Sequence, residues 1–242
     1  MKTPYKYIPF VSPVYRKFKR AMLLNLYQGK NVNCPLCETS FSNWRGNEDF
    51  GSCPKCGSMP RHRLLFLYLK NNDLLYSSSS RILHFAPEKC WIDKLKTTSN
   101  LEYITADLSA PEADFKIDIT DINFDSQSFD IVLCSHVLEH IIDDRKAINE
   151  LFRVLTPGGT AYIQVPYNSS KPTDEDFTIT NPQERKKRFG QSDHVRTYGL
   201  DFQQRLESGG FEVTQEHYAI KLTSEQRKYF GVWDDVIFVC NK

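Results

Sequence analysis

The 242-residue sequence has no long apolar run, no internal repeat and almost no net charge. No segment approaches the roughly 18 apolar residues that a membrane-spanning helix needs, and the amino-terminal end lacks the apolar core of a signal peptide. The formal charge of +1 argues against a positive field that would bind nucleic acid over the whole surface. It does not exclude a local basic patch. With 40% apolar residues the composition is that of a globular protein, and we expect a cytoplasmic one.

The seven cysteines fit a reducing compartment, since three of them are isolated in the sequence (Cys90, Cys134 and Cys240). The other four form two Cys-x-x-Cys pairs separated by fifteen residues: Cys34, Cys37, Cys53 and Cys56. This spacing predicts a zinc ribbon over residues 34–60, in which four thiolates hold one zinc ion. Because protein ligands fill all four positions, we expect a structural rather than a catalytic metal. Two disulfides are the alternative, which a cytoplasmic location disfavours.

Residues 1–33 carry seven basic side chains and no acidic one. Apolar residues between Val11 and Leu26 recur at helical spacing, and prolines confine the helix to the part after Pro13. One interpretation is a helix in peripheral contact with an anionic membrane surface. The other is a helix that packs on its own protein and exposes a basic face to solvent.

Residues 61–80 read as a connecting helix and a linker. Leu64 to Leu69 are apolar nearly all round, which predicts a helix clamped between the ribbon and the main domain. On the central loop of the ribbon, Trp44, Arg45 and Phe50 can either bind nucleic acid or pack against that domain.

The segment Phe129–His140 is the centre of the remaining chain. Its apolar residues 131–133 predict a strand buried on both faces, as in a parallel sheet covered by helices. Polar residues follow where this strand ends, which is the edge at which open α/β sheets bind ligands. A helix capped by Asp143 or Asp144 comes next, then Pro-Gly-Gly, then a further strand over 160–166.

The segments FDIVLCSHVLEHI and RVLTPGGTAYIQVP resemble the fourth-strand and fifth-strand signatures of class I S-adenosylmethionine-dependent methyltransferases of the type 11-like group. The resemblance covers residues 81–242. It implies an α/β fold with a Rossmann-like seven-stranded sheet, mostly parallel and ending in an antiparallel hairpin, preceded here by the small zinc ribbon. It also implies S-adenosylmethionine as cofactor. Further strands are expected over 81–88, 101–107, 115–120, 211–215 and 235–240, and a helix over 198–207.

The resemblance also indicates where the cofactor would lie. It places contacts at His84, Ala86, Glu88, Asp107, Leu108, Asp118, Ile119, Ser135 and His136. Asp107 ends a predicted strand, where a carboxylate can accept both ribose hydroxyls; capping its own loop is the alternative. The sequence departs from the family after the first strand, because His84 stands at an acidic position and Ala86 and Glu88 replace two glycines.

Residues 167–197 interrupt the sheet pattern with a polar insertion, which we interpret as a substrate lid, with a solvated charged loop as the alternative. Asp193 and His194 suggest a carboxylate that orients an imidazole. We therefore predict His194 as the catalytic base, with His136 and Tyr198 as further catalytic candidates. The predicted substrate contacts are Tyr167, Asp193 and Arg196. His136 is as well explained by a structural role, and Glu139 and His140 by packing and capping.

The resulting hypothesis is an S-adenosylmethionine-dependent methyltransferase. Its acceptor would be a small or carrier-linked compound, phosphorylated or sugar-like, that is methylated on a hydroxyl. The alternatives are an RNA methyltransferase that uses the zinc ribbon to bind RNA, and a non-catalytic scaffold with the same fold.

Overall fold

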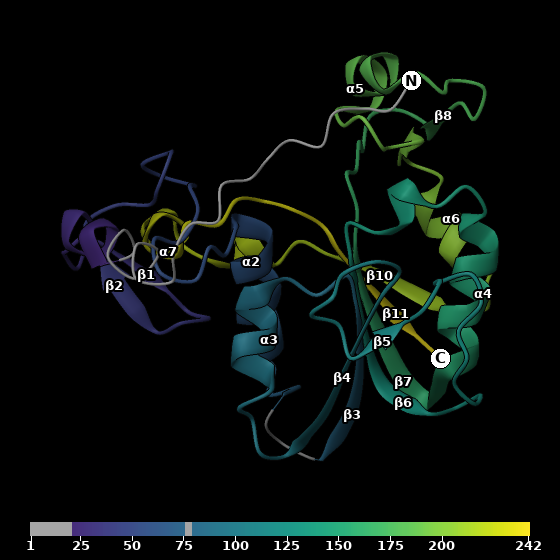
Figure 1. Cartoon of the computed structure of the whole chain (residues 1–242), viewed down its shortest axis with the longest axis horizontal. Helices are drawn as coiled ribbons and strands as arrows, with labels where there is room; N and C mark the ends of the chain where they lie inside the picture. Colours follow the sequence, from purple (N-terminus) through teal and green to yellow (C-terminus); the bar gives the residue numbers. More distant parts are fainter. Residues whose placement is uncertain (1–20, 76–78) are drawn as a thin grey trace.

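The computed structural model describes residues 21–75 and 79–242, and a seven-stranded sheet lies at its centre (Figure 1). The strands are β3 (Ser80–Phe85), β4 (Leu101–Asp107), β5 (Phe115–Lys116), β6 (Phe129–Ser135), β7 (Leu155–Gln164), β10 (Glu212–Glu216) and β11 (Ile237–Asn241). Their order is β10-β11-β7-β6-β3-β4-β5. The strands from β5 to β7 are parallel, whereas β11 runs antiparallel to both β7 and β10. The predicted mixed sheet with an antiparallel carboxyl-terminal hairpin is confirmed.

The order of connection creates a crevice at one edge of this sheet. From β3 the chain proceeds outward to β4 and β5, and then returns to β6 on the other side of β3. Such a reversal leaves the space beyond the carboxyl ends of β3 and β6 free for a ligand. All residues of β6 except Asp130 are buried, as its apolar run predicts.

Helices cover both faces of the sheet. The helices are α2 (Pro60–Asn71), α3 (Lys89–Leu95), α4 (Asp144–Val154), α5 (Pro182–Phe189), α6 (Phe202–Glu207) and α7 (Ser224–Phe230), with 3-10 turns η1 (Leu138–His140) and η2 (Tyr218–Lys221). Of these, α5 belongs to the insertion and α7 lies beside the amino-terminal ribbon (Figure 1). The helices α4 and α6 pack on one face through Ile148, Leu151 and Phe202, and α2 and α3 lie on the other (Figure 1). Asp143 caps α4 by accepting from the backbone N–H of Lys146 at 3.0 Å. The capping role expected of Glu139 and His140 is therefore wrong.

Two elements are shorter than the sequence suggested. The strand expected over 115–120 ends at Lys116, because Asp118 accepts from the backbone N–H of Thr120 at 2.9 Å and turns the chain. The helix expected from Tyr198 begins at Phe202. Tyr198 itself still belongs to the insertion, whose backbone it joins through a bridge with Tyr167.

The amino-terminal ribbon packs against α2 and α7, on the side of the sheet where α2 and α3 lie (Figure 1). Its hairpin consists of β1 (Val32–Cys34) and β2 (Thr39–Phe41). Trp44 is only 2% exposed and donates from its indole Nε1 to the carbonyl of Lys228 in α7 at 3.4 Å. Phe50 makes an edge contact with Trp233. Of the two roles open to this loop, packing is the one that these aromatic side chains take.

The expected membrane-contact helix lies largely outside the described residues, which begin at position 21. Residues 21–26 are helical, with Met22 and Leu26 exposed and Leu24 packed on the ribbon side of the core. None of the described helices is long and apolar enough to span a bilayer.

Candidate functional site

A cavity of about 480 Å³ lies at the carboxyl ends of β3, β4 and β6. Six of the nine predicted cofactor positions line it: Ala86, Asp107, Leu108, Asp118, Ile119 and His136. Val137, His140, Ile141 and Asp193 complete the wall on the insertion side. The sheet topology thus brings together residues that are up to 50 positions apart in the sequence.

Two of the three carboxylates that line this cavity, those of Asp107 and Asp118, differ little in their local bonding. Asp107 accepts from the backbone N–H groups of Ser109 and Ala110 through Oδ1, both at 2.6 Å. The loop-capping role considered for Asp107 is therefore real, and it uses one oxygen of the carboxylate. Its Oδ2 accepts no hydrogen bond from the described residues and stays available to a ligand. Asp118 likewise uses Oδ1 for its own turn.

Left-handed backbone marks the tips of β3 and β6. Ala86 has a φ of 49° and His136 a φ of 56°, a region that non-glycine residues occupy at a cost of about 1–2 kcal/mol. Both tips are pinned by hydrogen bonds to neighbouring strands, from Ala86 to the carbonyl of Ala106 and from His136 to that of Gln164. Strain of this kind is characteristic of ligand-binding edges. It places the small Ala86 and the ring of His136 at the rim of the crevice.

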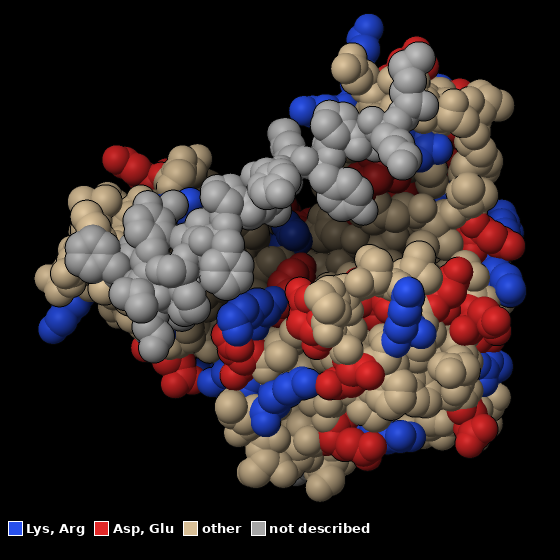
Figure 2. All heavy atoms as spheres, viewed as in Figure 1, with Lys and Arg blue, Asp and Glu red and all other residues tan. Residues whose placement is uncertain are grey.

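A second cavity of about 450 Å³ adjoins the first, with which it shares Ala86, His136 and His140. Its other lining residues are Arg61, Glu88, Ser135, Pro166, Phe189, Gly190, Gln191 and His194. The surface is hollowed between the lobe that carries α5 and the body of the sheet domain (Figure 2). Residues 189–191 end α5, so the insertion forms one wall of this second cavity.

Several buried polar atoms in and beneath this cavity have no hydrogen-bond partner among the described residues. They are Arg61 Nε, Glu88 Oε2, His136 Nε2, Glu139 Oε2, Gln164 Nε2 and His194 Nε2. Buried polar groups are nearly always satisfied in folded proteins, and unsatisfied ones gather where a ligand supplies the partner. The second cavity is therefore built to receive a polar group.

Glu88 and His84 differ in their relation to the site. Glu88 contacts His62 Nε2 at 2.7 Å and Arg61 at 3.7 Å. Burial opposes ionisation, but the hydrogen bond from His62 and the nearby positive charges outweigh it and lower the pKa of Glu88 to about 2.

His84 lines neither cavity. It is 1% exposed, hydrogen-bonds the hydroxyl of Tyr103 at 2.8 Å, and has its pKa lowered to about 4 by burial. The expected cofactor contact of His84 is therefore replaced by a place in the core.

His194 does lie at the second cavity, but its predicted partner is a different one. Its Nδ1 lies 3.0 Å from the carbonyl oxygen of Phe189, which can only accept, so Nδ1 carries the proton and Nε2 bears the lone pair. Desolvation lowers the pKa of His194. Asp193 contacts His140 Nδ1 instead, at 3.3 Å. Asp193 thus orients a histidine, although not the one that the sequence suggested.

Arg196 and Tyr198 hold the insertion in place and are not available to a substrate. Both side chains are fully buried. The Arg196 guanidinium donates to Glu175 at 2.9 Å and to the carbonyls of residues 138, 141 and 142, and the Tyr198 hydroxyl donates to Asp144 at 2.8 Å. Burial and the Asp144 charge raise the pKa of Tyr198 well above its usual value. The expected substrate contact of Arg196 and catalytic role of Tyr198 are corrected accordingly.

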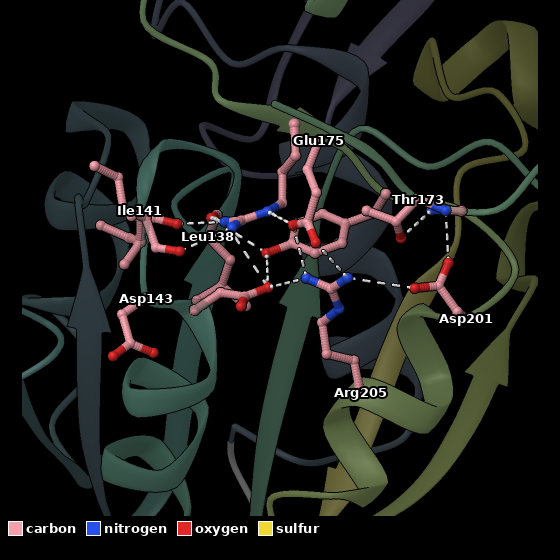
Figure 3. Close-up of polar contacts among 12 residues, drawn as sticks. Leu138, Ile141, Asp143, Thr173, Glu175, Asp201 and Arg205 are labelled. Carbon is pink, nitrogen blue, oxygen red and sulfur yellow. Dashed lines mark hydrogen bonds and ion pairs between the residues drawn. The ribbon is translucent and has the colours of Figure 1, made fainter. Parts of the chain in front are cut away.

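The same buried network includes a second arginine (Figure 3). Arg205 of α6 donates to Asp144 and to Glu175, both at 3.0 Å. Glu175 lies in β8 (Asp174–Glu175), which pairs with β9 (Arg196–Thr197) at the two ends of the insertion. Tyr167, the remaining predicted substrate contact, packs its ring on Phe238 and lines neither cavity.

Four residues in or beside the site were not among the predicted ones. Arg61 was read only as the start of a helix, and Glu139 and His140 as packing residues. Asp235, before β11, is partly buried, and burial raises its pKa against the opposing charges of His136 and Arg61. No local pattern distinguishes these side chains, because α2 and the β11 approach reach the site only through tertiary packing.

The four ribbon cysteines meet at one point. The sulfurs of Cys34 and Cys56, and those of Cys37 and Cys53, are each 3.6 Å apart, and all four lie within 4.8 Å of one another. A disulfide would need about 2.05 Å. Tetrahedral zinc with Zn–S bonds of about 2.3 Å separates its sulfurs by about 3.8 Å. The donor set therefore fits a four-thiolate zinc ion, and all four cysteines are unbridged.

Strand order, crevice and carboxylate tips together define a class I, Rossmann-like methyltransferase fold. The Methyltransferase domain family model matches residues 94–163. The matched segment, under a third of the chain, is similar to this family, and the sheet has the fold of class I S-adenosylmethionine-dependent methyltransferases.

Known proteins share the fold at low sequence identity. The (4+2)-cyclase SpnF superposes with a TM-score of 0.52 at 14% identity, covering 82% of this chain and 85% of that one. An S-adenosylmethionine-dependent methyltransferase from Archaeoglobus fulgidus superposes with a TM-score of 0.50 at 14% identity. The match covers 74% of this chain and 93% of that one. A demethylmenaquinone methyltransferase of Clavibacter sepedonicus is 48% identical over 46 residues. The matched part is 19% of this chain and 19% of that protein, about a fifth of each.

Proposed function

We propose that this protein transfers the methyl group of S-adenosylmethionine to a hydroxyl of a small, acidic or sugar-like acceptor. The observation that carries the proposal is the pair of adjoining cavities at the sheet's switch point, one of which has the features of a nucleoside site. The named relatives at this fold include methyltransferases of small molecules, such as that of demethylmenaquinone.

The first cavity would hold the nucleoside half of the cofactor. Asp107 offers Oδ2 to the ribose hydroxyls, and Asp118 with Ile119 offers an acceptor and an apolar face to the adenine. The methionine half would pass close to Ala86, whose small side chain permits the approach. Glu88, kept ionised by His62, is the anion suited to the methionine ammonium group.

The second cavity would hold the acceptor. Its volume suits a small molecule, and one wall comes from the insertion at residues 189–191. Arg61 supplies a cationic group there, which favours a phosphorylated or acidic acceptor over a neutral one. RNA finds less support, because Trp44, an aromatic candidate on the ribbon, is buried against α7.

The reaction requires alignment and the loss of one proton. As the new O–CH₃ bond forms, the S–CH₃ bond breaks and the sulfonium becomes a neutral thioether, so the acceptor hydroxyl must give up its proton. A sulfonium methyl is already electrophilic, and the chain mainly has to hold both partners at near-attack distance. His136 and His194 both line the acceptor cavity, and the Nε2 atom of each has no hydrogen-bond partner among the described residues. One of these two imidazoles would take the proton.

Calorimetric titration of the full chain with S-adenosylmethionine tests the cofactor site. In Asp107→Asn, Oδ1 can still cap the loop, but the amide nitrogen that replaces Oδ2 cannot accept from ribose hydroxyls. We expect at least about tenfold weaker binding, because a hydrogen bond to a charged group contributes about 1.5–3 kcal/mol. Asp125→Asn, at the opposite end of β6, is the matched control and should bind like the wild type. Absence of binding by the wild-type protein at millimolar cofactor would leave the scaffold alternative in its place.

A further inference from the structure

We propose that Glu139, His140 and His194 form a second metal site, which holds a divalent transition-metal ion at the floor of the acceptor cavity. The position of that cavity rests on the proposed function, but the site itself is argued from the chain's own side chains. One donor atom from each residue lies within 4.8 Å of the other two. Two of these residues are buried inside the protein, Glu139 at 0% and His194 at 2% exposure.

The His194 lone pair and the Glu139 carboxylate lie close together in a buried place, which is unfavourable unless a cation lies between them. His194 Nε2 bears a lone pair, because Nδ1 carries the proton that bonds to Phe189. It lies 4.0 Å from Glu139 Oε1, and among the described residues neither this Nε2 nor the second carboxylate oxygen, Oε2, has a hydrogen-bond partner. Two acceptors that face each other without a hydrogen between them repel, and burial makes this costly. A cation at this point would satisfy both.

The spacing suits direct coordination. Bonds of about 2.0–2.2 Å from a metal to nitrogen and oxygen place tetrahedral ligands about 3.3–3.6 Å apart. The separation of 4.0 Å between His194 and Glu139 exceeds this by a few tenths of an ångström, and the widest separation, below 4.8 Å, would have to close by about 1 Å through side-chain rotation. Two imidazoles and one carboxylate favour zinc, iron or cobalt over magnesium or calcium.

Each candidate ligand is oriented by a partner behind it, as ligands of metal sites usually are. His140 Nδ1 lies 3.3 Å from Asp193, and His194 Nδ1 is held by Phe189. Glu139 Oε1 lies 3.1 Å from His136 Nδ1. The two imidazole rings of His140 and His194 lie nearly perpendicular, with centroids 4.7 Å apart.

The insertion anchors bring these ligands together from two parts of the chain. Val195 donates its backbone N–H to the carbonyl of Glu139 at 3.0 Å, and Arg196 binds the carbonyls of the turn around η1. His194 is thus fixed against the element that carries the other two ligands. A solvated loop would need none of these contacts.

Three protein ligands leave coordination positions free, and His140 and His194 both line the acceptor cavity. An acceptor hydroxyl bound there would lose its proton more readily, since a divalent ion lowers the pKa of a bound oxygen. With His194 Nε2 committed to the ion, His136 Nε2 is the group that takes this proton. The ion would thus acidify the acceptor hydroxyl, and His136 would supply the base, for the methyl transfer described above.

Metal stoichiometry tests the site on the full chain. Apoprotein titrated with Co²⁺ alone should bind two equivalents, one with the intense thiolate charge-transfer absorption of the ribbon and one with only the weak bands of nitrogen and oxygen ligands. His140→Ala, at a partly exposed position, and the near-isosteric Glu139→Gln should each lose the second equivalent, weakening it at least about tenfold, and keep the first. His217→Ala, an exposed histidine beside Asp234, should retain both.

Binding of a single equivalent by the wild type, or an undiminished second equivalent in both variants, would overturn the proposal. In that case a hydrogen-bond donor of the acceptor would be the partner of the buried atoms. Titration with S-adenosylmethionine in parallel separates this result from failure of the proposed function. Cofactor binding with one metal refutes only the metal site, and two metals without cofactor binding refute only the methyltransferase activity.

Discussion

Replacing Arg63 by methionine should destabilise the whole chain, because this buried arginine joins three segments that are distant in sequence. Its guanidinium donates to the carbonyls of Gly51 and Ser58 in the ribbon, at 2.9 and 2.5 Å. It also donates to those of Phe230 and Gly231 at the carboxyl end of α7, at 2.8 and 2.6 Å. The side chain is 0% exposed. Burial lowers its pKa only to about 10, so it stays charged at neutral pH.

The expected loss can be summed from these contacts. Each buried carbonyl left without a donor costs about 1 kcal/mol or more, which gives about 4 kcal/mol for the four of them. The guanidinium also lies 3.9 Å from the ring centre of Trp44, and a buried cation–π contact adds about 1–2 kcal/mol. We therefore expect Arg63→Met to lower the free energy of unfolding by about 4–6 kcal/mol. A domain is typically stable by about 5–15 kcal/mol, so the variant would be marginal.

Urea unfolding with saturating zinc, followed by tryptophan fluorescence, measures this loss. Arg45→Met in the same ribbon is the control, since Arg45 is exposed, and it should change stability by no more than about 0.5 kcal/mol. Arg63→Lys should fall between the two, because one ammonium cannot reach carbonyls on both sides. A loss below about 1 kcal/mol in Arg63→Met would show that the carbonyls find other donors and would refute the reasoning.

Three further predictions concern the site and the ribbon. Ala86→Gly should raise the free energy of unfolding by about 0.5 kcal/mol in thermal denaturation. Relief of the left-handed backbone gains about 1–2 kcal/mol, which exceeds the cost of about 0.4–1 kcal/mol that glycine adds by making the unfolded chain more flexible. A loss of stability above about 1 kcal/mol would contradict the φ of Ala86. The pKa of Glu88 is lowered, against the effect of burial, to about 2 from an ordinary 4.5. Ionised Glu88 therefore adds to the free energy of unfolding above pH 4.5, and this stabilisation is lost as the pH falls toward 2. Between pH 6 and pH 3 the wild type should therefore lose about 2 kcal/mol more than Glu88→Gln, and equal pH dependence of the two proteins would argue against an ionised Glu88. Cys37→Ser should remove the thiolate-bound cobalt or zinc equivalent and destabilise the ribbon, whereas Cys240→Ser, remote from the ribbon, should retain the metal in elemental analysis.

The sequence predicted those features that depend on local pattern. A few neighbouring residues were enough to predict each of three features: the strand β6 that is buried on both faces, the helix cap at Asp143, and the cluster of four cysteines. Asp107 could be placed because a strand tip is itself a local feature. What lay beyond reach was the direction in which a polar side chain points once the insertion has folded.

The insertion illustrates why. Asp193, His194 and Arg196 were read together because they are neighbours in sequence, yet successive residues of an extended segment point to opposite sides. Asp193 therefore points away from the side that His194 and Arg196 share. Both His194 and Arg196 are buried, and Arg196 serves as an anchor because its guanidinium is bound by Glu175 and by backbone carbonyls. Asp193 pairs with His140, 53 positions earlier, which no spacing rule connects to it. Sequence could identify the polar segment but not the side of it that is functional.

The first turn of α2 links the ribbon to the methyl-transfer cavities. Arg61 lines the acceptor cavity, His62 holds the Glu88 carboxylate at 2.7 Å, and Arg63 is bound to the carbonyls of the ribbon. Three successive side chains thus point to three different neighbours, and none of them can move without the backbone of the others. A zinc ribbon that only stabilised its own fold would need no such junction. The ribbon is thus joined, through this turn of α2, to one wall of the proposed acceptor cavity.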